Sequence, residues 1–253
     1  MHMQKKYTSV VLVPLLSILL YACSAKPTAQ TVVDSAIEAH GGKNFENFKV
    51  DFDFRDKHYT AIRRGGEFTY VRAFTDSTGT YRDVLNNAGF TRYRNDSVQS
   101  LTAEKRDAFM NSVNSVLYFA LLPFGLNDGA VIKELVSEEE VRGKFYHVIK
   151  VTFKQEGGGT DFQDEFLYWI ETKTNTVDYF AYSYHTNGGG IRFRQAIHTQ
   201  QAGGIRWQDY VNYKAADEKN TTLFQLMPLF KENKLVELSR IELKNIQVSN
   251  SAN

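Results

Sequence analysis

The stretch Val50-Asp-Phe-Asp-Phe-Arg55 alternates apolar and charged side chains without a break. Successive side chains of a β-strand point to opposite faces, so this pattern predicts a strand with one buried and one solvated face. Similar stretches follow as far as Asn95, separated by turns rich in Gly, Asn or Asp. The sequence therefore predicts a meander of five antiparallel strands.

Strand patterns return near Ala130 and continue to Val248. Some are apolar on both faces, as in Phe166-Leu-Tyr-Trp-Ile170, which is typical of strands that lie between two layers or that line an interior while packing a helix. Hairpin turns between the strands leave no room for the crossovers that parallel strands need. The pattern predicts antiparallel pairing, with about eleven strands in all.

Two helices interrupt these strands. The segment 31–40 has apolar residues at helical spacing and ends at Gly41-Gly42. The segment 101–122 has a longer apolar stripe and ends at Pro123 and Gly125. The expected fold class is mainly β (α+β): a curled antiparallel half-barrel wrapped round one long helix, with a short N-terminal helix. No linker or repeat is visible, so residues 31–253 are expected to form one domain.

The first 23 residues predict export. Lys5 and Lys6 precede an apolar segment that is shorter than the roughly 20 residues of a spanning helix. The segment ends Leu20-Tyr-Ala-Cys23, which resembles the lipobox of bacterial lipoproteins. In that family the Cys receives a diacylglycerol and the chain is cut before it. We expect a signal peptide at 1–22, lipid attachment at Cys23 and an acylated tether at 23–30; a cleaved secretory signal with an incidental Cys is the alternative.

A wider resemblance rests on Ala36-Ile-Glu-Ala-His-Gly-Gly-Lys-Asn-Phe45, followed by Phe52-Asp-Phe-Arg55, and on the order of the elements. These features resemble the LolA-like superfamily and, more narrowly, a group of Bacteroidota lipoproteins within it. The resemblance implies an open half-barrel whose concave apolar side is lidded by helices and can hold an acyl chain. LolA itself is a soluble carrier without an acylated Cys, so a carrier function does not follow from the fold.

The expected location follows from the lipobox resemblance. Ser24, and not Asp, follows Cys23. In lipoprotein sorting of the enterobacterial kind, this implies passage to the outer membrane. The expected location is the cell envelope, with the protein held at the outer membrane by the lipid on Cys23 and facing the periplasm.

Composition and motifs argue against several function classes. The chain has 30 Lys+Arg against 29 Asp+Glu, which lacks the basic excess of a nucleic-acid binder. One Cys allows neither a disulfide framework nor a multi-Cys metal site. No hydrolase, zinc-protease, P-loop or dinucleotide motif is present. We therefore expect no catalytic residue, no metal and no cofactor, and the protein is not expected to be an enzyme.

Some polar residues have an ordinary structural explanation. His40 lies where a helix ends and would interact with the last carbonyl groups. Asp51 and Asp53 share a strand face that could offer oxygen ligands to a cation, but a solvated outer face is favoured. Arg92 and Arg94 are expected on an exposed strand face.

The high aromatic content, with 18 Phe and 14 Tyr, is the remaining feature of the sequence that indicates a function. A sheet of this length has more apolar surface than two helices cover, so a leftover groove is a candidate ligand site. The expected lining residues are Phe52, Phe54, Phe68, Tyr70, Phe109, Val113, Leu117, Tyr168 and Tyr182.

The expected function is a lipid-anchored lipoprotein that binds a lipophilic ligand, such as an acyl chain. The alternative is a structural or assembly lipoprotein that acts through contact with a protein partner, which the sequence does not identify.

Overall fold

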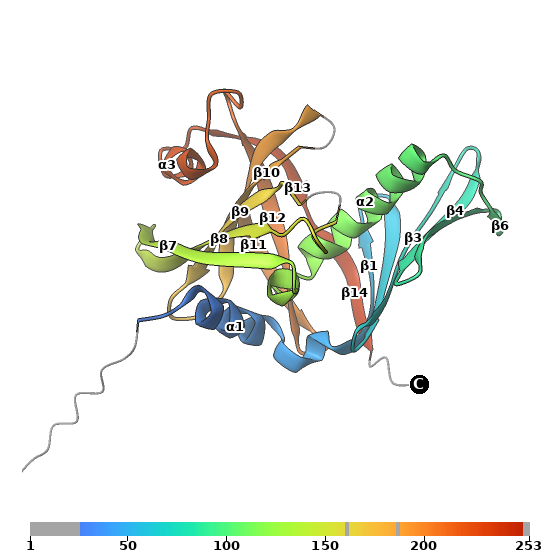
Figure 1. Ribbon diagram of the computed structural model, residues 1–253, viewed down its shortest axis with the longest axis horizontal. Helices are drawn as coiled ribbons and strands as arrows, with labels where there is room; N and C mark the ends of the chain where they lie inside the picture. The colour runs from blue at the N-terminus through green and yellow to red at the C-terminus, as the bar shows by residue number, and fades with distance from the viewer. Residues whose placement is uncertain (1–25, 160–161, 186–187, 250–253) are drawn as a thin grey trace, which may run out of the picture.

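The computed structural model describes residues 26–159, 162–185 and 188–249 (Figure 1). The segment 1–22 and the first three residues of the expected tether, Cys23 included, therefore lie outside the described residues. The helices and 3-10 turns are α1 (Ala29–His40), η1 (Gly42–Phe45), α2 (Ala103–Ala120), η2 (Phe124–Asn127), η4 (Leu223–Gln225) and α3 (Leu226–Lys231). The strands are β1 (Asn47–Phe54), β2 (Lys57–Arg64), β3 (Glu67–Asp76), β4 (Gly79–Asn86), β5 (Gly89–Arg94), β6 (Ser97–Val98), β7 (Val131–Val141), β8 (Lys144–Phe153), β9 (Glu165–Glu171), β10 (Val177–Tyr184), β11 (Gly190–Ala202), β12 (Ile205–Ala215), β13 (Leu235–Ile241) and β14 (Leu243–Ser249).

These strands form two antiparallel sheets of seven strands each. The first sheet has the order β14-β1-β2-β3-β4-β5-β6, and the second has the order β13-β12-β11-β10-β9-β8-β7. The mainly-β class, the antiparallel pairing and the meander are confirmed. The structure has more strands than the roughly eleven expected. β6 was not foreseen, and the expected strand 235–248 is divided at Glu242 into β13 and β14.

The break at Glu242 joins the two sheets. β13 pairs with β12 in the second sheet, whereas β14 pairs with β1 in the first. The backbone N–H of Leu243 donates to the Asp209 carboxylate at 2.9 Å, and the Gln200 side chain donates to the Leu243 carbonyl at 3.2 Å. These bonds satisfy the backbone polar groups at the corner where the chain changes sheets.

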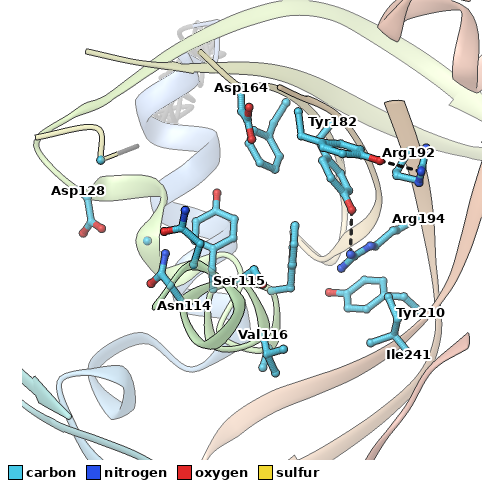
Figure 2. A pocket seen from close by; sticks show the side chains of 18 of the residues that line it. Asn114, Ser115, Val116, Asp128, Asp164, Tyr182, Arg192, Arg194, Tyr210 and Ile241 are labelled. Carbon is cyan, nitrogen blue, oxygen red and sulfur yellow. Dashed lines mark hydrogen bonds between the residues drawn. The ribbon is translucent and has the colours of Figure 1, made fainter. Parts of the chain in front are cut away.

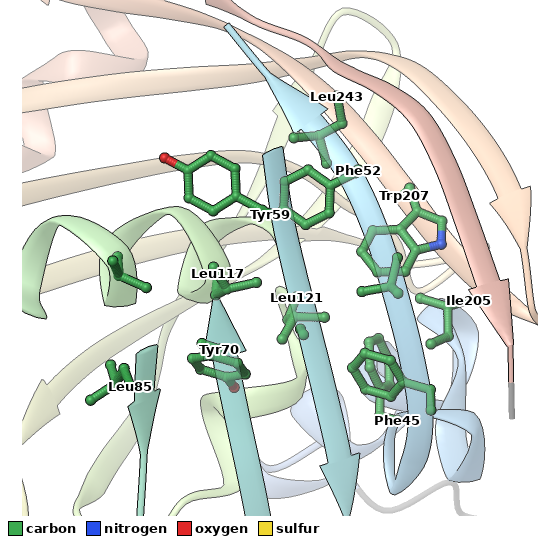
Figure 3. Packing of buried hydrophobic residues seen from close by; sticks show 14 residues of the cluster. Phe45, Phe52, Tyr59, Tyr70, Leu85, Leu117, Leu121, Ile205, Trp207 and Leu243 are labelled. Atoms are coloured by element: carbon green, nitrogen blue, oxygen red, sulfur yellow. The ribbon is translucent and has the colours of Figure 1, made fainter. Parts of the chain in front are cut away.

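The long helix α2 lies between the two sheets (Figure 1). Its predicted position is confirmed, and the Thr102 hydroxyl caps it by accepting from the Lys105 N–H at 3.4 Å. Val113 and Leu117 are fully buried on the side that packs against the first sheet, in a cluster that also contains Phe52 (Figure 3). Burial of this narrow apolar stripe fixes which side of α2 faces the first sheet.

The short helix α1 begins earlier than predicted, because Thr28 and Thr31 form a capping box. Its predicted end is confirmed: Gly42 has φ +51, a conformation that glycine adopts without strain. His40 is 1% exposed, and its Nε2 accepts a hydrogen bond from the Val177 N–H of β10 at 3.1 Å. Burial lowers the pKa of His40 to about 3, so the ring is neutral and its role is to accept from a strand, not to neutralise the helix end as expected.

Both faces of the second sheet are covered, as the doubly apolar strands predicted. Along β9, Phe166, Tyr168 and Ile170 face the side covered by α1 and the end of α2. Leu167 and Trp169 face the opposite side, which α3 and η4 cover. The sequence reading missed α3, although four apolar residues around it recur at helical spacing. These are Leu223, Leu226, Met227 and Phe230.

A charged triad lies beneath α2 in the first sheet. Arg72, Asp83 and Arg92 occupy adjacent positions on β3, β4 and β5. The Asp83 carboxylate is fully buried and accepts from both guanidinium groups at 2.6–2.9 Å. The expectation that Arg92 is exposed is wrong: it is 8% exposed, because α2 covers this face and places the Phe109 ring 3.4 Å from the guanidinium carbon.

Candidate functional site

A cavity of about 690 Å³ lies alongside α2 and the inner face of the second sheet, and it is partly open to solvent (Figure 2). This volume is within the range of roughly 300–1,000 Å³ that is usual for small-molecule sites. Its walls come from α2, from the turn after η2 and from β8 to β13, with a smaller contribution from the edges of β1, β3 and β4. Segments distant in the sequence therefore converge on one hollow.

The side chains of α2 divide between the two sheets. Leu117 packs on the first sheet, whereas the next residues, Tyr118 and Phe119, reach the second sheet. The Tyr118 and Tyr168 hydroxyls are 3.0 Å apart and form a hydrogen bond. Tyr168 is fully buried and Tyr118 is half-buried, and desolvation raises the pKa of each phenol well above its usual value. This bond fixes the C-terminal end of α2 against the wall of the cavity.

The apolar part of the cavity wall is a group of aromatic rings. The Phe119 ring centroid is 5.2 Å from that of Tyr182, and Phe166 is 5.4 Å from Tyr182. Phe153 meets Phe166 edge to face at 5.9 Å. Ring separations in this range are favourable, and the exposed parts of the rings offer flat apolar surfaces to a ligand.

Two arginines of β11 border these rings. Arg192 donates to the Tyr184 hydroxyl at 2.8 Å and forms an ion pair with Glu218. Arg194 donates to the Tyr182 hydroxyl at 3.0 Å (Figure 2). Its guanidinium carbon is 3.9 Å from the Phe119 ring centroid. The aromatic wall therefore ends at a cationic edge.

Two carboxylates also line the cavity. Asp164 accepts a hydrogen bond from the His185 backbone N–H at 3.3 Å, and its carboxylate lies 3.4 Å from the His185 ring. Burial raises the pKa of Asp128, although Arg63 and Lys133 partly oppose that shift. The polar groups of the cavity thus include both signs of charge.

The structure separates the nine residues predicted to line a cavity. Phe54, Phe68 and Tyr182 lie in the cavity wall. Four of the nine pack in the cluster between α2 and the first sheet: Phe52, Tyr70, Val113 and Leu117. Tyr168 packs on the inner face of the second sheet. The ring of Phe109 lies against the Arg92 guanidinium. Whether any of these residues binds a ligand stays a prediction.

The predicted lining residues did not include Phe119, Phe166, Arg192 or Arg194. A pattern for the arginines was present: in Gly190-Ile-Arg-Phe-Arg194, Arg192 and Arg194 share a face. The register pairs Arg192 with Tyr182 and Arg194 with Phe180, so both fall on the inner face of the second sheet. Strand register was the missing information, and alternation alone does not give it.

Among the described residues, no group of three or more His, Cys, Asp or Glu side chains could hold a metal ion. Asp51 forms an ion pair with Lys49 at 2.9 Å, and Asp53 accepts from Asn245 at 2.7 Å. His58 lies 2.8 Å from Asp53. In the same part of the chain, no helix is long and apolar enough to cross a membrane.

Comparison with known proteins gives a family and a fold. The model of a family of unknown function, DUF6503, matches residues 9–243. No curated protein matches. Among solved structures, a DUF1329 family protein from Desulfovibrio piger is similar with a TM-score of 0.51 and 12% identity, covering 87% of this chain and 92% of that one. At this identity the likeness shows a shared fold alone.

A LolA superfamily protein from Nitrosomonas europaea is also similar, with a TM-score of 0.48 and 12% identity, covering 88% of this chain and 92% of that one.

Proposed function

The chain belongs to the DUF6503 family, and we propose that it is a binding protein, not an enzyme, that takes a lipophilic ligand into the cavity beside α2. The observation that carries this proposal is the aromatic wall formed by Phe119, Phe166 and Tyr182 around a hollow of about 690 Å³. Apolar ligands gain roughly 25 cal/mol for each Å² of apolar surface removed from water. In this proposal the two sheets act together as the open half-barrel expected from the sequence.

The proposal includes a route for the ligand. The helix α2 ends at Ala120 and is followed by Pro123 and Gly125, which interrupt helical hydrogen bonding. This segment is the hinge that we propose for movement of α2 away from the second sheet. Such a movement would break the Tyr118–Tyr168 hydrogen bond and widen the cavity.

The remaining elements of the proposal rest on the sequence. We propose that residues 1–22 are removed, that Cys23 carries the lipid, and that residues 31–253 form one domain held at the outer membrane and facing the periplasm. Cys23→Ser should abolish incorporation of radioactive palmitate in growing cells and release the protein from the membrane fraction. Label retained in the variant would refute lipid attachment at Cys23.

Titration of the purified protein with a fluorescent fatty-acid analogue tests the binding function. Ala120 lines the cavity and is small, so Ala120→Trp should fill part of it and weaken binding about tenfold or more. Ala108, on an exposed part of the same helix, gives the matched control Ala108→Trp, which should bind as the unchanged protein does. Binding should show a negative heat-capacity change, because apolar surface is buried.

Three outcomes count against the ligand-binding function. One is no saturable binding up to the solubility limit, which is the result that the assembly alternative expects. The second is equal binding by the unchanged protein and Ala120→Trp. The third is equal weakening by both tryptophan variants.

A further inference from the structure

Arg194 is a buried cation in the wall of the cavity. It is 7% exposed and projects from β11, between Phe180 on β10 and Asn212 on β12. Figure 2 shows its side chain reaching toward the Tyr182 hydroxyl beside the aromatic wall. The Phe119 ring lies against the guanidinium carbon at 3.9 Å, so the charge is held between aromatic surfaces and not in water.

The guanidinium of Arg194 has fewer hydrogen-bond and ion-pair partners than a buried cation usually has. Within residues 26–159, 162–185 and 188–249, its only hydrogen bond goes to the neutral Tyr182 hydroxyl, and no carboxylate forms an ion pair with it. Its Nε is buried without a partner. Its neighbour on the same strand, Arg192, is paired with Glu218. Buried charges in proteins are normally paired, because removing an ion from water costs several kcal/mol.

The chemistry of Arg194 selects one class of partner. A guanidinium presents several N–H donors in a plane and binds the two oxygens of a carboxylate or phosphate. The Tyr182 hydroxyl accepts from Nη2 alone, and the buried Nε has no hydrogen-bond partner in the described structure. The aromatic wall begins at the same residue, since the Tyr182 ring packs on Phe119 and Phe166.

We propose that Arg194 binds the anionic head group of an amphiphile whose hydrocarbon chain lies against the aromatic wall of the cavity. The inference rests on the proposed function and adds the charge of the ligand and its orientation. The carboxylates of Asp128 and Asp164 also line the cavity, and neither forms an ion pair with Arg194. They repel an anionic head group from their own positions. Arg55 also lines the cavity but is exposed, whereas Arg194 is buried beside the aromatic wall.

Competition binding with single-chain amphiphiles that differ only in the head group tests this inference. The probe is a neutral fluorescent naphthylamine, displaced from the purified protein by palmitate, hexadecanol or hexadecylamine. Palmitate should displace it about ten- to a hundredfold more effectively than hexadecanol, since a hydrogen bond to a charged group contributes about that factor. A palmitoyl lysophosphatidic acid arm distinguishes a carboxylate from a phosphate head group.

Two variants separate the role of Arg194 from general disturbance. Arg194→Met keeps an apolar contact with Phe119 and should reduce the palmitate preference to the level of hexadecanol. Arg240→Gln removes a cation of β13 that is paired with Glu237 and does not line the cavity, and it should keep the preference. The comparison of palmitate with hexadecanol on the unchanged protein stands even where Arg194→Met fails to fold.

The outcomes distinguish the inference from the proposed function. Binding of the naphthylamine without preference among head groups, a preference for hexadecylamine, or an anion preference that survives in Arg194→Met would each overturn the inference and leave a lipophilic site standing. Failure of the naphthylamine and of every amphiphile to bind would remove the proposed function, and the inference with it.

Discussion

Two buried arginine sites in this molecule differ in how their charge is balanced. Under α2, the first sheet holds Arg72 and Arg92 on either side of the fully buried Asp83. Across the molecule, the second sheet holds Arg194 with aromatic rings and one hydroxyl group, but with no ion-pair partner among the described residues. Both sites lie on strands covered by the same helix.

The difference indicates different roles. The triad has an internal counter-ion, and Arg72 also donates to the Ser112 hydroxyl of α2 at 2.7 Å, so the triad positions the helix on the sheet. Arg194 faces the cavity, where an anion from outside the chain can approach it. We therefore infer that the first sheet is the structural half of the molecule and the second sheet is the ligand-binding half.

The largest expected effect concerns the counter-ion of the triad. Asp83→Asn leaves two buried guanidinium groups without a carboxylate and should lower the free energy of unfolding by about 3–5 kcal/mol. Urea denaturation measures the change. The control, Asp107→Asn, removes a partly exposed carboxylate paired with Arg106 and should change stability by no more than about 0.5 kcal/mol. A loss below about 1 kcal/mol in Asp83→Asn would show that the triad is not structural.

A second comparison uses neighbouring residues of α2. Leu117 is fully buried against the first sheet, so Leu117→Ala should cost about 2–5 kcal/mol. Val116 lines the cavity and is only partly buried, so Val116→Ala should cost less than about 1 kcal/mol. Thermal and urea unfolding of both variants check the difference. Equal losses would mean that the full burial of Leu117 is not what holds α2 on the first sheet.

The buried His40 of α1, which accepts from β10 of the second sheet, gives a pH dependence. The pKa of His40 is lowered from about 6.5 to about 3 in the folded protein, so the unfolded chain binds more protons in this window. Stability from this group is therefore complete above about pH 6.5 and is lost as the pH falls, by about 2 kcal/mol between pH 7 and pH 5.

His40→Gln provides the control for this pH effect, because its amide oxygen can still accept from the Val177 N–H. The difference in unfolding free energy between the two proteins should shrink as the pH falls from 7 to 5. A difference that is constant over this range would mean that His40 is not kept neutral by burial.

The smallest expected effect is the change in the free energy of unfolding when Arg194 is replaced. Because its charge has no counter-ion in the described structure, Arg194→Met should change the free energy of unfolding of the ligand-free protein by less than about 1 kcal/mol, or raise it. Urea denaturation without added amphiphile is the measurement. A loss comparable to that of Asp83→Asn would place Arg194 among the structural groups and remove the contrast between the two sheets.

Local periodicity predicted the strands, α2 and the double apolar faces of the second sheet. It did not predict the change of sheet at Glu242, because hydrogen bonds from distant residues fix that corner. The missed helix α3 is only six residues long, and Pro228 lies inside it. The aromatic residues suggested a cavity, but its position depends on strand register and on which side of α2 faces each sheet, and both are tertiary properties.

Mass spectrometry of lipids extracted from the protein purified from its own cells tests the central claim most directly. The account predicts one class of single-chain amphiphile with an anionic head group in the unchanged protein, and its loss from Ala120→Trp but not from Ala108→Trp. Extraction that yields no amphiphile from the unchanged protein, or the same amphiphile in equal amount from Ala120→Trp, would contradict it.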